Sequence, residues 1–390
     1  MDQGVSRTDL PLLSEPWFAV SEYHARLAAV QEVLVERGLG GLLLFQPESV
    51  TWLTGFFTRG YASFQCVLVP AKGEPVTCCR DMEAYYFEKT GVFPERRFWS
   101  DTDNPAEIAG TLIASYFPSA GRIAIELKAW PLSVDRHSKI TSLLAGRELV
   151  DGSDIVARLR QRKSPAEIYL MRQAAKAAEA GMAKAEATAA AGITERAMAA
   201  SISSALIEAG SDMQGPGVLA SGERALHLHG SYTDKRIEAG ETLQFEVLAC
   251  VRHYHARFMR TIKIEYASDT EKVLAEQLIS IQDAALAEVG PGVAATVPDR
   301  IYREGVLSRG LAERYSNKTF YGVGLLLPPS GGEGLEASPA ALWSFEPGMT
   351  LHSYLLAQGF GFSETILITE TGYERLTNYP RELILAAAAG

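Results

Sequence analysis

The feature that most constrains the fold of this chain is a break in its pattern around residue 160. A basic, polar segment, Arg160-Gln161-Arg162-Lys163, is followed at once by Ser164-Pro165-Ala166-Glu167. Ser at the N-cap, Pro at the first helical position and Glu at the third satisfy the free backbone N–H groups that begin a helix. Because 390 residues exceed what one hydrophobic core usually holds, we predict two domains, residues 1–162 and 163–390.

The residues before this boundary alternate between helical and strand patterns. Residues 22–37 carry an apolar face with helical spacing, and Gly38 then suits the end of a helix. Strand patterns follow at 41–45, 64–70 and 122–126, and residues 46–49 have the composition of a turn. The pattern therefore predicts a small α/β domain.

The residues after the boundary combine helices with longer strands. Helical patterns cover residues 165–191, 194–209, 270–289 and 297–310, and strand patterns cover 242–251, 259–266, 350–356 and 363–369. Long strands that pair in antiparallel fashion and are flanked by helices are typical of an α+β domain, and we expect it to be the catalytic one.

Charge and composition exclude several classes of function. The net charge of −10, with no basic stripe to offset it, argues against nucleic acid as a partner. No apolar run is long enough to cross a bilayer, and residues 1–13 lack the apolar core of a signal peptide, so we expect a cytoplasmic protein without a membrane partner. Four cysteines are too few and too unevenly spaced for a disulfide scaffold or a zinc site, which indicates reduced thiols.

Five short motifs occur in an informative order. They are Arg162 to Ile168, His229 eleven residues before Gly240-Glu241, Tyr254 with Arg260-Thr261, Tyr321-Gly322-Val323-Gly324, and Glu346-Pro347-Gly348-Met349. Through them the chain, from about residue 20 to 375, resembles the creatinase/methionine-aminopeptidase family. The resemblance implies a pita-bread catalytic domain preceded by a smaller creatinase-type α/β domain.

Aminopeptidases of that family hold two divalent ions with two Asp, one His and two Glu. The corresponding positions here carry Glu246, Arg257, Tyr321, Tyr354 and Ser363, with Glu364 displaced by one residue toward the opposite strand face. Hard divalent ions need several oxygen or imidazole ligands, and an Arg among them would repel the ions. We therefore predict neither a metal site nor another cofactor.

Within this family the chain resembles the ectoine hydrolases. The shared segments include His227-Leu228-His229, Phe245-Glu246, Glu364-Thr365-Ile366 and, in the first domain, Thr51-Trp52-Leu53. The resemblance implies a metal-independent hydrolase of a C–N bond in a small molecule. The specific expectation is ring opening of ectoine, a cyclic amidine with a carboxylate, to N-acetyl-diaminobutyrate in compatible-solute catabolism.

Two residues are predicted to carry the chemistry. Glu246 is the candidate nucleophile or general base, since a carboxylate can attack the amidine carbon or activate water. The alternative is a structural ion pair with Arg257 or Arg260. His229 is the candidate proton shuttle, because imidazole takes and gives protons near neutral pH. His227 would share a face with His229 if both lay on a strand, and the two could then exchange roles.

The remaining candidates are predicted to bind substrate. Arg257 and Arg260 suit a substrate carboxylate, since guanidinium offers it two parallel hydrogen bonds. Tyr321 and Tyr354 would fill the volume that ions occupy in relatives. Less specific candidates are Tyr254, His255, His352 and Glu364. Trp52 and Phe56 resemble positions that line the neighbouring subunit's pocket, which implies a homodimer and an aromatic wall for a cationic ring.

Three alternatives stay open at this stage. One is an amidinohydrolase of creatine-like compounds, or a hydrolase of another cyclic amide. Another is a catalytically inactive pita-bread module that binds a protein or peptide. The last is a metal-dependent Xaa-Pro peptidase, against which the replaced ligand positions argue.

Overall fold

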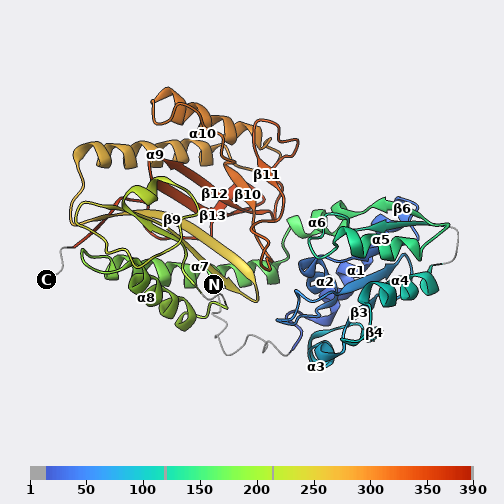
Figure 1. The fold of residues 1–390 in the computed structure, drawn as a ribbon. Helices are drawn as coiled ribbons and strands as arrows, with labels where there is room; N and C mark the ends of the chain where they lie inside the picture. The colour runs from blue at the N-terminus through green and yellow to red at the C-terminus, as the bar shows by residue number, and fades with distance from the viewer. Residues whose placement is uncertain (1–14, 118–120, 213–214, 388–390) are drawn as a thin grey trace. The chain divides into compact units, whose positions relative to one another are not determined.

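The computed structural model describes residues 15–117, 121–212 and 215–387 (Figure 1). The chain forms two compact units, Met1–Arg160 and Gln161–Gly390. Among the described residues, no helix has the length and apolar character needed to cross a membrane. The four cysteines are buried free thiols.

The first unit is built on one mixed six-stranded sheet. Its central strand β1 pairs in parallel with β5 and in antiparallel fashion with β2, and apolar residues of α4 and α5 such as Ile113 and Ile140 share the core of this sheet. This arrangement confirms the predicted α/β domain. The sheet order is β4 (Arg96–Trp99), β3 (Val76–Arg80), β2 (Cys66–Pro70), β1 (Gly41–Leu44), β5 (Arg122–Ile125) and β6 (Glu148–Asp151). The helices are α1 (Val20–Glu36), α2 (Pro47–Thr54), α3 (Ala84–Thr90), α4 (Pro105–Tyr116), α5 (Val134–Ser142) and α6 (Ser153–Gln161).

The turn predicted at residues 46–49 is instead the start of helix α2, which begins at Pro47. The carboxylate of Glu126 accepts hydrogen bonds from the backbone N–H groups of Phe45 and Gln46 and from the hydroxyl of Ser49. A negative group at this end also suits the helix dipole. Because Glu126 lies 77 residues beyond Ser49 in the chain, local sequence carries no sign of this support.

The second unit opens with helix α7 (Pro165–Thr188), whose start agrees with the predicted signal. The Ser164 hydroxyl accepts a hydrogen bond from the Glu167 N–H, and the Glu167 carboxylate accepts one from the Ser164 N–H. Small residues along α7 let it approach its neighbours: a Cβ on Gly181 would lie 2.6 Å from the Leu206 side chain. The other helices are α8 (Glu195–Glu208), α9 (Asp269–Ala287) and α10 (Thr296–Ser308).

Two sheets form the centre of this unit, and each is covered by one pair of helices (Figure 1). Met182 of α7 packs with Phe245 in the core of the first sheet, whereas Leu278 of α9 packs with Phe362 in the core of the second. The α+β architecture predicted for this half is thereby confirmed. The first sheet has the order β15 (Ile384–Ala386), β9 (Tyr254–Ile264), β8 (Thr242–Val251) and β7 (Gly217–Ser221). The second has the order β11 (Glu336–Ala337), β10 (Phe320–Gly322), β12 (Thr350–Ala357), β13 (Phe360–Ile368) and β14 (Tyr373–Arg375).

The two sheets meet along β9 and β13, where Ser and Thr hydroxyls bridge the backbones. The Ser363 hydroxyl accepts from the Met259 N–H at 2.6 Å, and the Thr365 hydroxyl accepts from the Arg257 N–H at 2.9 Å and donates to its carbonyl. From one pair to the next, the residue number increases in β9 and decreases in β13, so the two strands run antiparallel. We call this contact the hydroxyl seam; its pairs are Arg257 with Thr365, Met259 with Ser363 and Thr261 with Gly361.

A buried ion pair reinforces the hydroxyl seam. Arg260 of β9 donates to the Glu364 carboxylate of β13 at 2.8 Å, and both side chains are 0% exposed. The same guanidinium reaches the carbonyl oxygens of Ser363 and Pro380. Burial raises the pKa of Glu364 even though Arg260 opposes the shift, so desolvation outweighs attraction. Such a pair adds little stability by itself, but removal of one partner leaves the other as a buried charge without a counter-ion.

We predict that Glu364→Gln lowers the free energy of unfolding by about 3–5 kcal/mol, because Arg260 then keeps a buried charge without its counter-ion. Urea denaturation followed by circular dichroism measures the loss. The matched control is Asp234→Asn, which breaks the Arg196–Asp234 pair, whose side chains are 57% and 79% exposed. The control should lose no more than about 1 kcal/mol. Equal losses in the two variants would contradict the structural role of the buried pair.

Candidate active site

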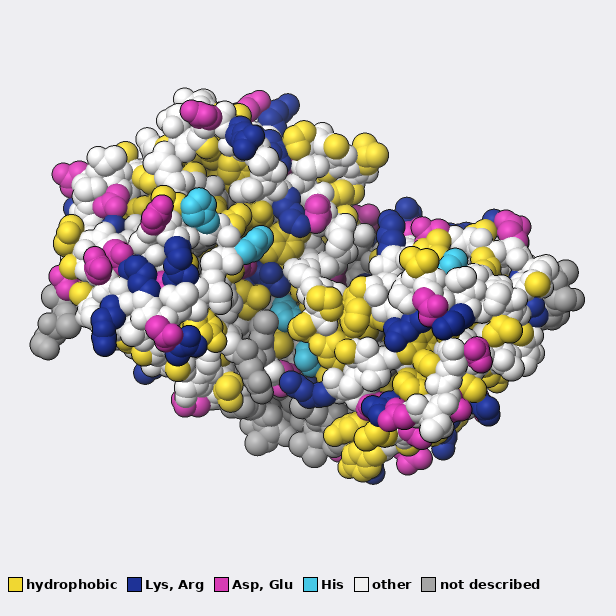
Figure 2. Space-filling model, in the orientation of Figure 1, with side chains coloured by type: hydrophobic (Ala, Val, Ile, Leu, Met, Phe, Trp, Pro, Cys, Tyr) yellow, Lys and Arg dark blue, Asp and Glu magenta, His cyan; other side chains and the backbone are white. Residues whose placement is uncertain are grey.

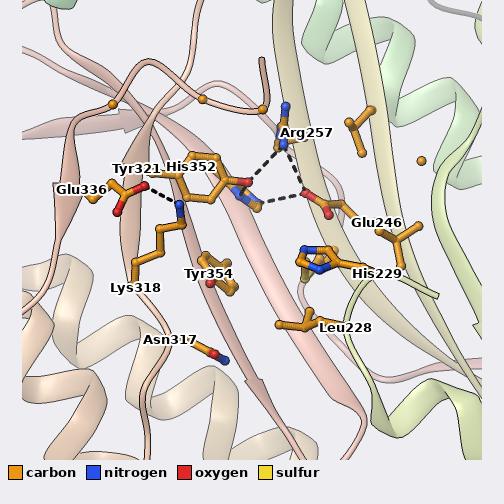
Figure 3. Close-up of a pocket in the computed structure, with 17 residues that line it drawn as sticks. Leu228, His229, Glu246, Arg257, Asn317, Lys318, Tyr321, Glu336, His352 and Tyr354 are labelled. Atoms are coloured by element: carbon orange, nitrogen blue, oxygen red, sulfur yellow. Dashed lines mark hydrogen bonds and ion pairs between the residues drawn. The ribbon is translucent and has the colours of Figure 1, made fainter. Parts of the chain in front are cut away.

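A cavity of about 680 Å³ lies in the second unit, beside the hydroxyl seam (Figure 3). Five of its polar side chains come from four long or central strands: Glu246 from β8, Arg257 from β9, Tyr321 from β10, and His352 and Tyr354 from β12. Other lining residues are Leu228, His229, Asn317, Lys318, Glu336 and the glycines at 331, 332 and 334. The volume suits a small molecule, and the polar groups converge on it from both sheets.

Glu246 is the buried carboxylate of this cavity. Its side-chain oxygen Oε1 finds no hydrogen-bond donor among the described residues. The nearest cationic or imidazole nitrogens, Arg257 Nη1 and His352 Nε2, both lie 3.9 Å away, beyond hydrogen-bonding distance. Burial raises the pKa of Glu246, and Arg257 and His229 lower it in part. A carboxylate in this environment is more basic than usual and has an oxygen free for a ligand.

Arg257 is held beside Glu246 by a tyrosine. Its Nη1 donates to the Tyr321 hydroxyl at 3.1 Å, and its guanidinium carbon lies 5.6 Å from the centre of the Tyr321 ring. Burial acts to lower the pKa of Arg257, but Tyr321 and Glu246 more than offset it, so the pKa rises. The guanidinium therefore stays charged next to the buried carboxylate.

His352 links the cavity to the seam through both of its ring nitrogens. Nδ1 lies 2.7 Å from the Tyr321 hydroxyl, and Nε2 lies 2.7 Å from the Ser363 hydroxyl. The imidazole also stacks on Tyr354, with ring centres 5.5 Å apart and planes inclined by 10°. Burial, and then Arg257, hold the pKa of His352 well below its usual range. His352, which the sequence predicts to bind substrate, is thus a neutral side chain held in one orientation at the edge of the cavity.

His229 lies at the cavity next to Glu246, as Figure 3 shows, while His227 is not part of the lining. The condition for a shared face, that both histidines lie on a strand, is not met. The chain leaves β7 at Ser221, forms a short 3₁₀ helix over Gly222–Leu226 and continues in a turn, where His229 has a φ of 66°. A positive φ breaks the alternation of side chains that a strand would impose. His229 therefore stands apart from His227 as the candidate proton carrier.

Four other predicted substrate-binding residues lie outside the lining of the cavity. Arg260 and Glu364 pair with each other in the hydroxyl seam. Tyr254 donates to the buried Glu167 carboxylate at 2.7 Å. His255 contacts the His253 carbonyl through Nδ1 at 2.8 Å, and burial, followed by Arg257, lowers its pKa to about 3. Each of the four has a partner that supports the fold around the site.

Trp52 and Phe56 are buried within the first unit. The guanidinium carbon of Arg26 lies 4.8 Å from the centre of the Trp52 ring, and Phe56 packs edge-on against Phe87 at 5.5 Å. Both side chains are thus part of that unit's own packing. Their contribution to the pocket of a neighbouring subunit stays a prediction, as does the homodimer.

The prediction from sequence missed the loop side of the cavity. Lys318 and Glu336, which form an ion pair there, and the glycines at 331–334 were not singled out. The loop is anchored by a buried ion pair between Glu333 and Lys163, whose side chains are 4% and 1% exposed. A Cβ on Gly324 would lie 2.5 Å from Glu333 Oε1, so glycine is needed there. The glycine-rich run after residue 330 is the one sequence feature that could have indicated this loop.

The donor set does not fit a pair of divalent ions. Of the five positions that correspond to ligands, Glu246, Arg257, Tyr321 and Tyr354 line the cavity and Ser363 lies behind His352. They supply one carboxylate, and a guanidinium nitrogen stands 3.9 Å from it. Within the described ranges, no group of three or more His, Cys, Asp or Glu side chains is arranged to hold a metal ion. Hard divalent ions require more oxygen ligands than these residues offer.

Comparisons with known proteins agree with this fold. The profile of metallopeptidase family M24 matches residues 169–370, and that of the creatinase/prolidase N-terminal domain matches residues 26–162. Dipeptidase PepE from Mycobacterium ulcerans superposes with a TM-score of 0.83 at 23% identity, covering 95% of this chain and 99% of that one. A prolidase from Pyrococcus horikoshii OT3 gives a TM-score of 0.80 at 21% identity, covering 92% and 100%. The predicted pita-bread fold with a creatinase-type first domain is confirmed.

Two curated relatives match along nearly their whole length. An uncharacterised hydrolase/peptidase, y4tM, of Sinorhizobium fredii is 26% identical over 387 residues, which cover 94% of this chain and 98% of that protein. The ectoine hydrolase of Halomonas elongata is 25% identical over 405 residues, with the same two coverages. Several further relatives are named as peptidases or dipeptidases, among them the probable dipeptidase PepE of Mycobacterium tuberculosis at 24% identity.

We predict that the His352 imidazole is neutral at pH 6 as well as at pH 8, although pH 6 lies below the usual histidine pKa. Nitrogen NMR of histidine-labelled protein measures this, with the resonance assigned by its loss in His352→Gln. Because an unfolded chain binds a proton at this residue near pH 6.5 and the native state does not, acid below that value should also lower stability. Imidazolium shifts for His352 at pH 6 would contradict the neutral side chain.

Proposed function

The chain belongs to metallopeptidase family M24 and carries a creatinase/prolidase N-terminal domain, and from this premise we propose that it hydrolyses a C–N bond of a small molecule without a metal ion. Ectoine is the best single candidate for the substrate. The observation that carries the proposal is the isolated, buried Glu246 at a position where peptidases of this family hold metal.

The residues at the five positions that correspond to metal ligands favour one of two ways of attacking a C–N bond. A peptidase with two metal ions activates water at the ions, which requires several anionic ligands. Here Glu246 is the one carboxylate among the five positions, and Arg257 occupies the space beside it. The peptidase relatives favour a peptide bond as the alternative target, but the side chains at this cavity favour attack by a protein carboxylate.

Glu246 is suited to begin the reaction. No described residue donates a hydrogen bond to its Oε1, so this oxygen can face a ligand. Burial raises the pKa of Glu246, which makes the ionised form a stronger base. A negative group also attracts the cationic amidinium carbon of ectoine. Either Glu246 attacks this carbon, or it removes a proton from a water molecule that does. In a single turnover in heavy-oxygen water, label in Glu246 would show direct attack followed by attack of water on the Glu246 acyl carbon, whereas activation of water by Glu246 places the label in the product.

His229 is placed to complete the reaction. It lines the same cavity, close enough to Glu246 to lower its pKa. When the ring C–N bond breaks, the leaving nitrogen needs a proton, and an imidazole can deliver one near neutral pH. If Glu246 activates water, the water oxygen becomes the acetamide oxygen. If Glu246 attacks directly and water then attacks its acyl carbon, a Glu246 oxygen becomes the acetamide oxygen and the water oxygen restores the carboxylate. On both routes the two protons of water are taken up in the product, and the leaving nitrogen becomes the amine of N-acetyl-diaminobutyrate.

We predict that Glu246→Gln loses activity by at least about 1,000-fold, because the amide is neither a nucleophile nor a base. Mass spectrometry follows the conversion of ectoine to N-acetyl-diaminobutyrate by chelator-treated protein. The substitution is nearly isosteric but leaves the buried Arg257 without its counter-ion, so melting temperatures are measured for both proteins and activity is compared where both are folded. Elemental analysis accompanies the assay: a stoichiometric transition metal required for turnover would refute the metal-independent proposal, and absence of product from native protein would exclude ectoine.

The acid side of the pH profile tests the state of Glu246. Since burial raises its pKa above the ordinary glutamate value, kcat/KM should fall with acid at a pH above 4.5. Arg257→Met removes the cation that opposes this shift, so its acid limb should move to still higher pH. A steady-state pH series with both proteins measures the two limbs. An unmoved limb in Arg257→Met would show that another group sets it.

A further inference from the structure

Two strongly basic side chains line the cavity among the described residues, Arg257 and Lys318. A substrate that carries a carboxylate is expected to pair with one of them, because an Arg or Lys side chain makes the stronger, charge-assisted hydrogen bond to a carboxylate. The two cations differ in burial and in their partners, and this difference indicates which of them is available to a ligand.

Arg257 stands beside the Glu246 carboxylate. Its guanidinium is almost fully buried, donates to the Tyr321 hydroxyl and lies 3.9 Å from Glu246, while its Nε has no hydrogen-bond partner among the described residues. A substrate carboxylate drawn to it would be placed against the Glu246 carboxylate, and two like charges in a buried site repel each other strongly. Arg260, the other guanidinium predicted to clamp a carboxylate, is enclosed by Glu364 and backbone carbonyls outside the cavity.

Lys318 is available in a way that neither arginine is. Its counter-ion is Glu336, and the two side chains are 40% and 51% exposed. An exposed pair of this kind contributes little free energy, so a ligand carboxylate can replace Glu336 at low cost. Figure 3 shows Lys318 and Glu246 on opposite sides of the cavity, with the Lys318 ammonium group directed at Glu336; Asn317 also lines the cavity.

The backbone that carries Lys318 is held firmly by helix α10. Arg303 donates to the carbonyl oxygens of Tyr315 and Asn317 at 2.6 and 2.7 Å. The Thr319 hydroxyl donates to Asp299 at 2.7 Å, and Asp299 in turn accepts from Arg303. Lys318 thus projects from a backbone segment whose position is set by α10, so the starting point of its side chain is fixed before a ligand binds.

We propose that Lys318 binds the carboxylate of the substrate, and that the cavity selects small molecules that carry an anion in addition to the cationic C–N group facing Glu246. This assignment rests on the proposed hydrolase function and adds the substrate class to it. Glu336 holds Lys318 when the cavity has no ligand and releases it when an anion arrives. Tyr321 also contacts this ammonium group, since its ring centre lies 5.1 Å from Lys318 Nζ.

The test compares two substrates on three proteins. The substrates are ectoine and 2-methyl-tetrahydropyrimidine, the same cyclic amidine without the carboxylate. The proteins are native enzyme, Lys318→Met and the matched variant Glu336→Gln. Lys318→Met should raise the KM for ectoine about 10- to 100-fold, as expected for a lost hydrogen bond to a charged group, with kcat nearly unchanged. Glu336→Gln should lower that KM about two- to fivefold, because the competing carboxylate is gone.

Neither substitution should change the KM for the amidine that lacks the carboxylate. This second substrate separates loss of anion binding from general damage to the site, and melting temperatures check that each variant folds. Equal effects of Lys318→Met on both substrates, or an unchanged KM for ectoine, would overturn the assignment of Lys318 while the native activity still supported the hydrolase function. Failure of native enzyme to open ectoine would refute the proposed substrate, and the role of Lys318 would be refuted with it.

Discussion

The hydroxyl seam between β9 and β13 is the contact on which the site depends. Because Ser363 and Thr365 bridge the two backbones through their side chains, the strands of the two sheets lie side by side without a full backbone ladder. Arg257 on one sheet thereby faces Tyr321 and His352 on the other. Ser363 serves both purposes, since its hydroxyl holds Met259 and also His352. A substitution in the hydroxyl seam would therefore move side chains that line the cavity.

The chemistry of the cavity follows from how its charges are arranged. One carboxylate is buried with an unsatisfied oxygen, one guanidinium neutralises it from a distance, and one imidazole is kept neutral by burial. Metallopeptidases solve the same problem of attacking a C–N bond with metal-bound water. Here tyrosines and a serine stand at three of the ligand positions, and they build a hydrogen-bonded wall from Tyr321 through His352 to Ser363 instead.

Local patterns predicted most of the long elements. The capping signal predicts the helix that starts at Pro165, and the apolar pattern of residues 242–251 predicts the strand found there. Each of these signals is contained within the element that it predicts. Helix α2 was taken for a turn, since the carboxylate that supports its first residues belongs to Glu126 on a distant strand. Whether His227 and His229 share a face could not be predicted, because alternation in the sequence does not reveal a positive φ at His229.

By itself, the sequence determined which groups are present at the site: the lone Glu246 and the cation, phenols and hydroxyl at the other ligand positions follow from motif order and spacing. Tertiary structure alone decided which of them meet. Arg260 and Glu364 form a buried pair away from the cavity, whereas Lys318 comes to the lining through contacts of its segment with α10. The reason is physical: residue type sets charge and hydrogen-bonding capacity, but burial and partners, which set pKa and availability, arise only when distant strands pack together.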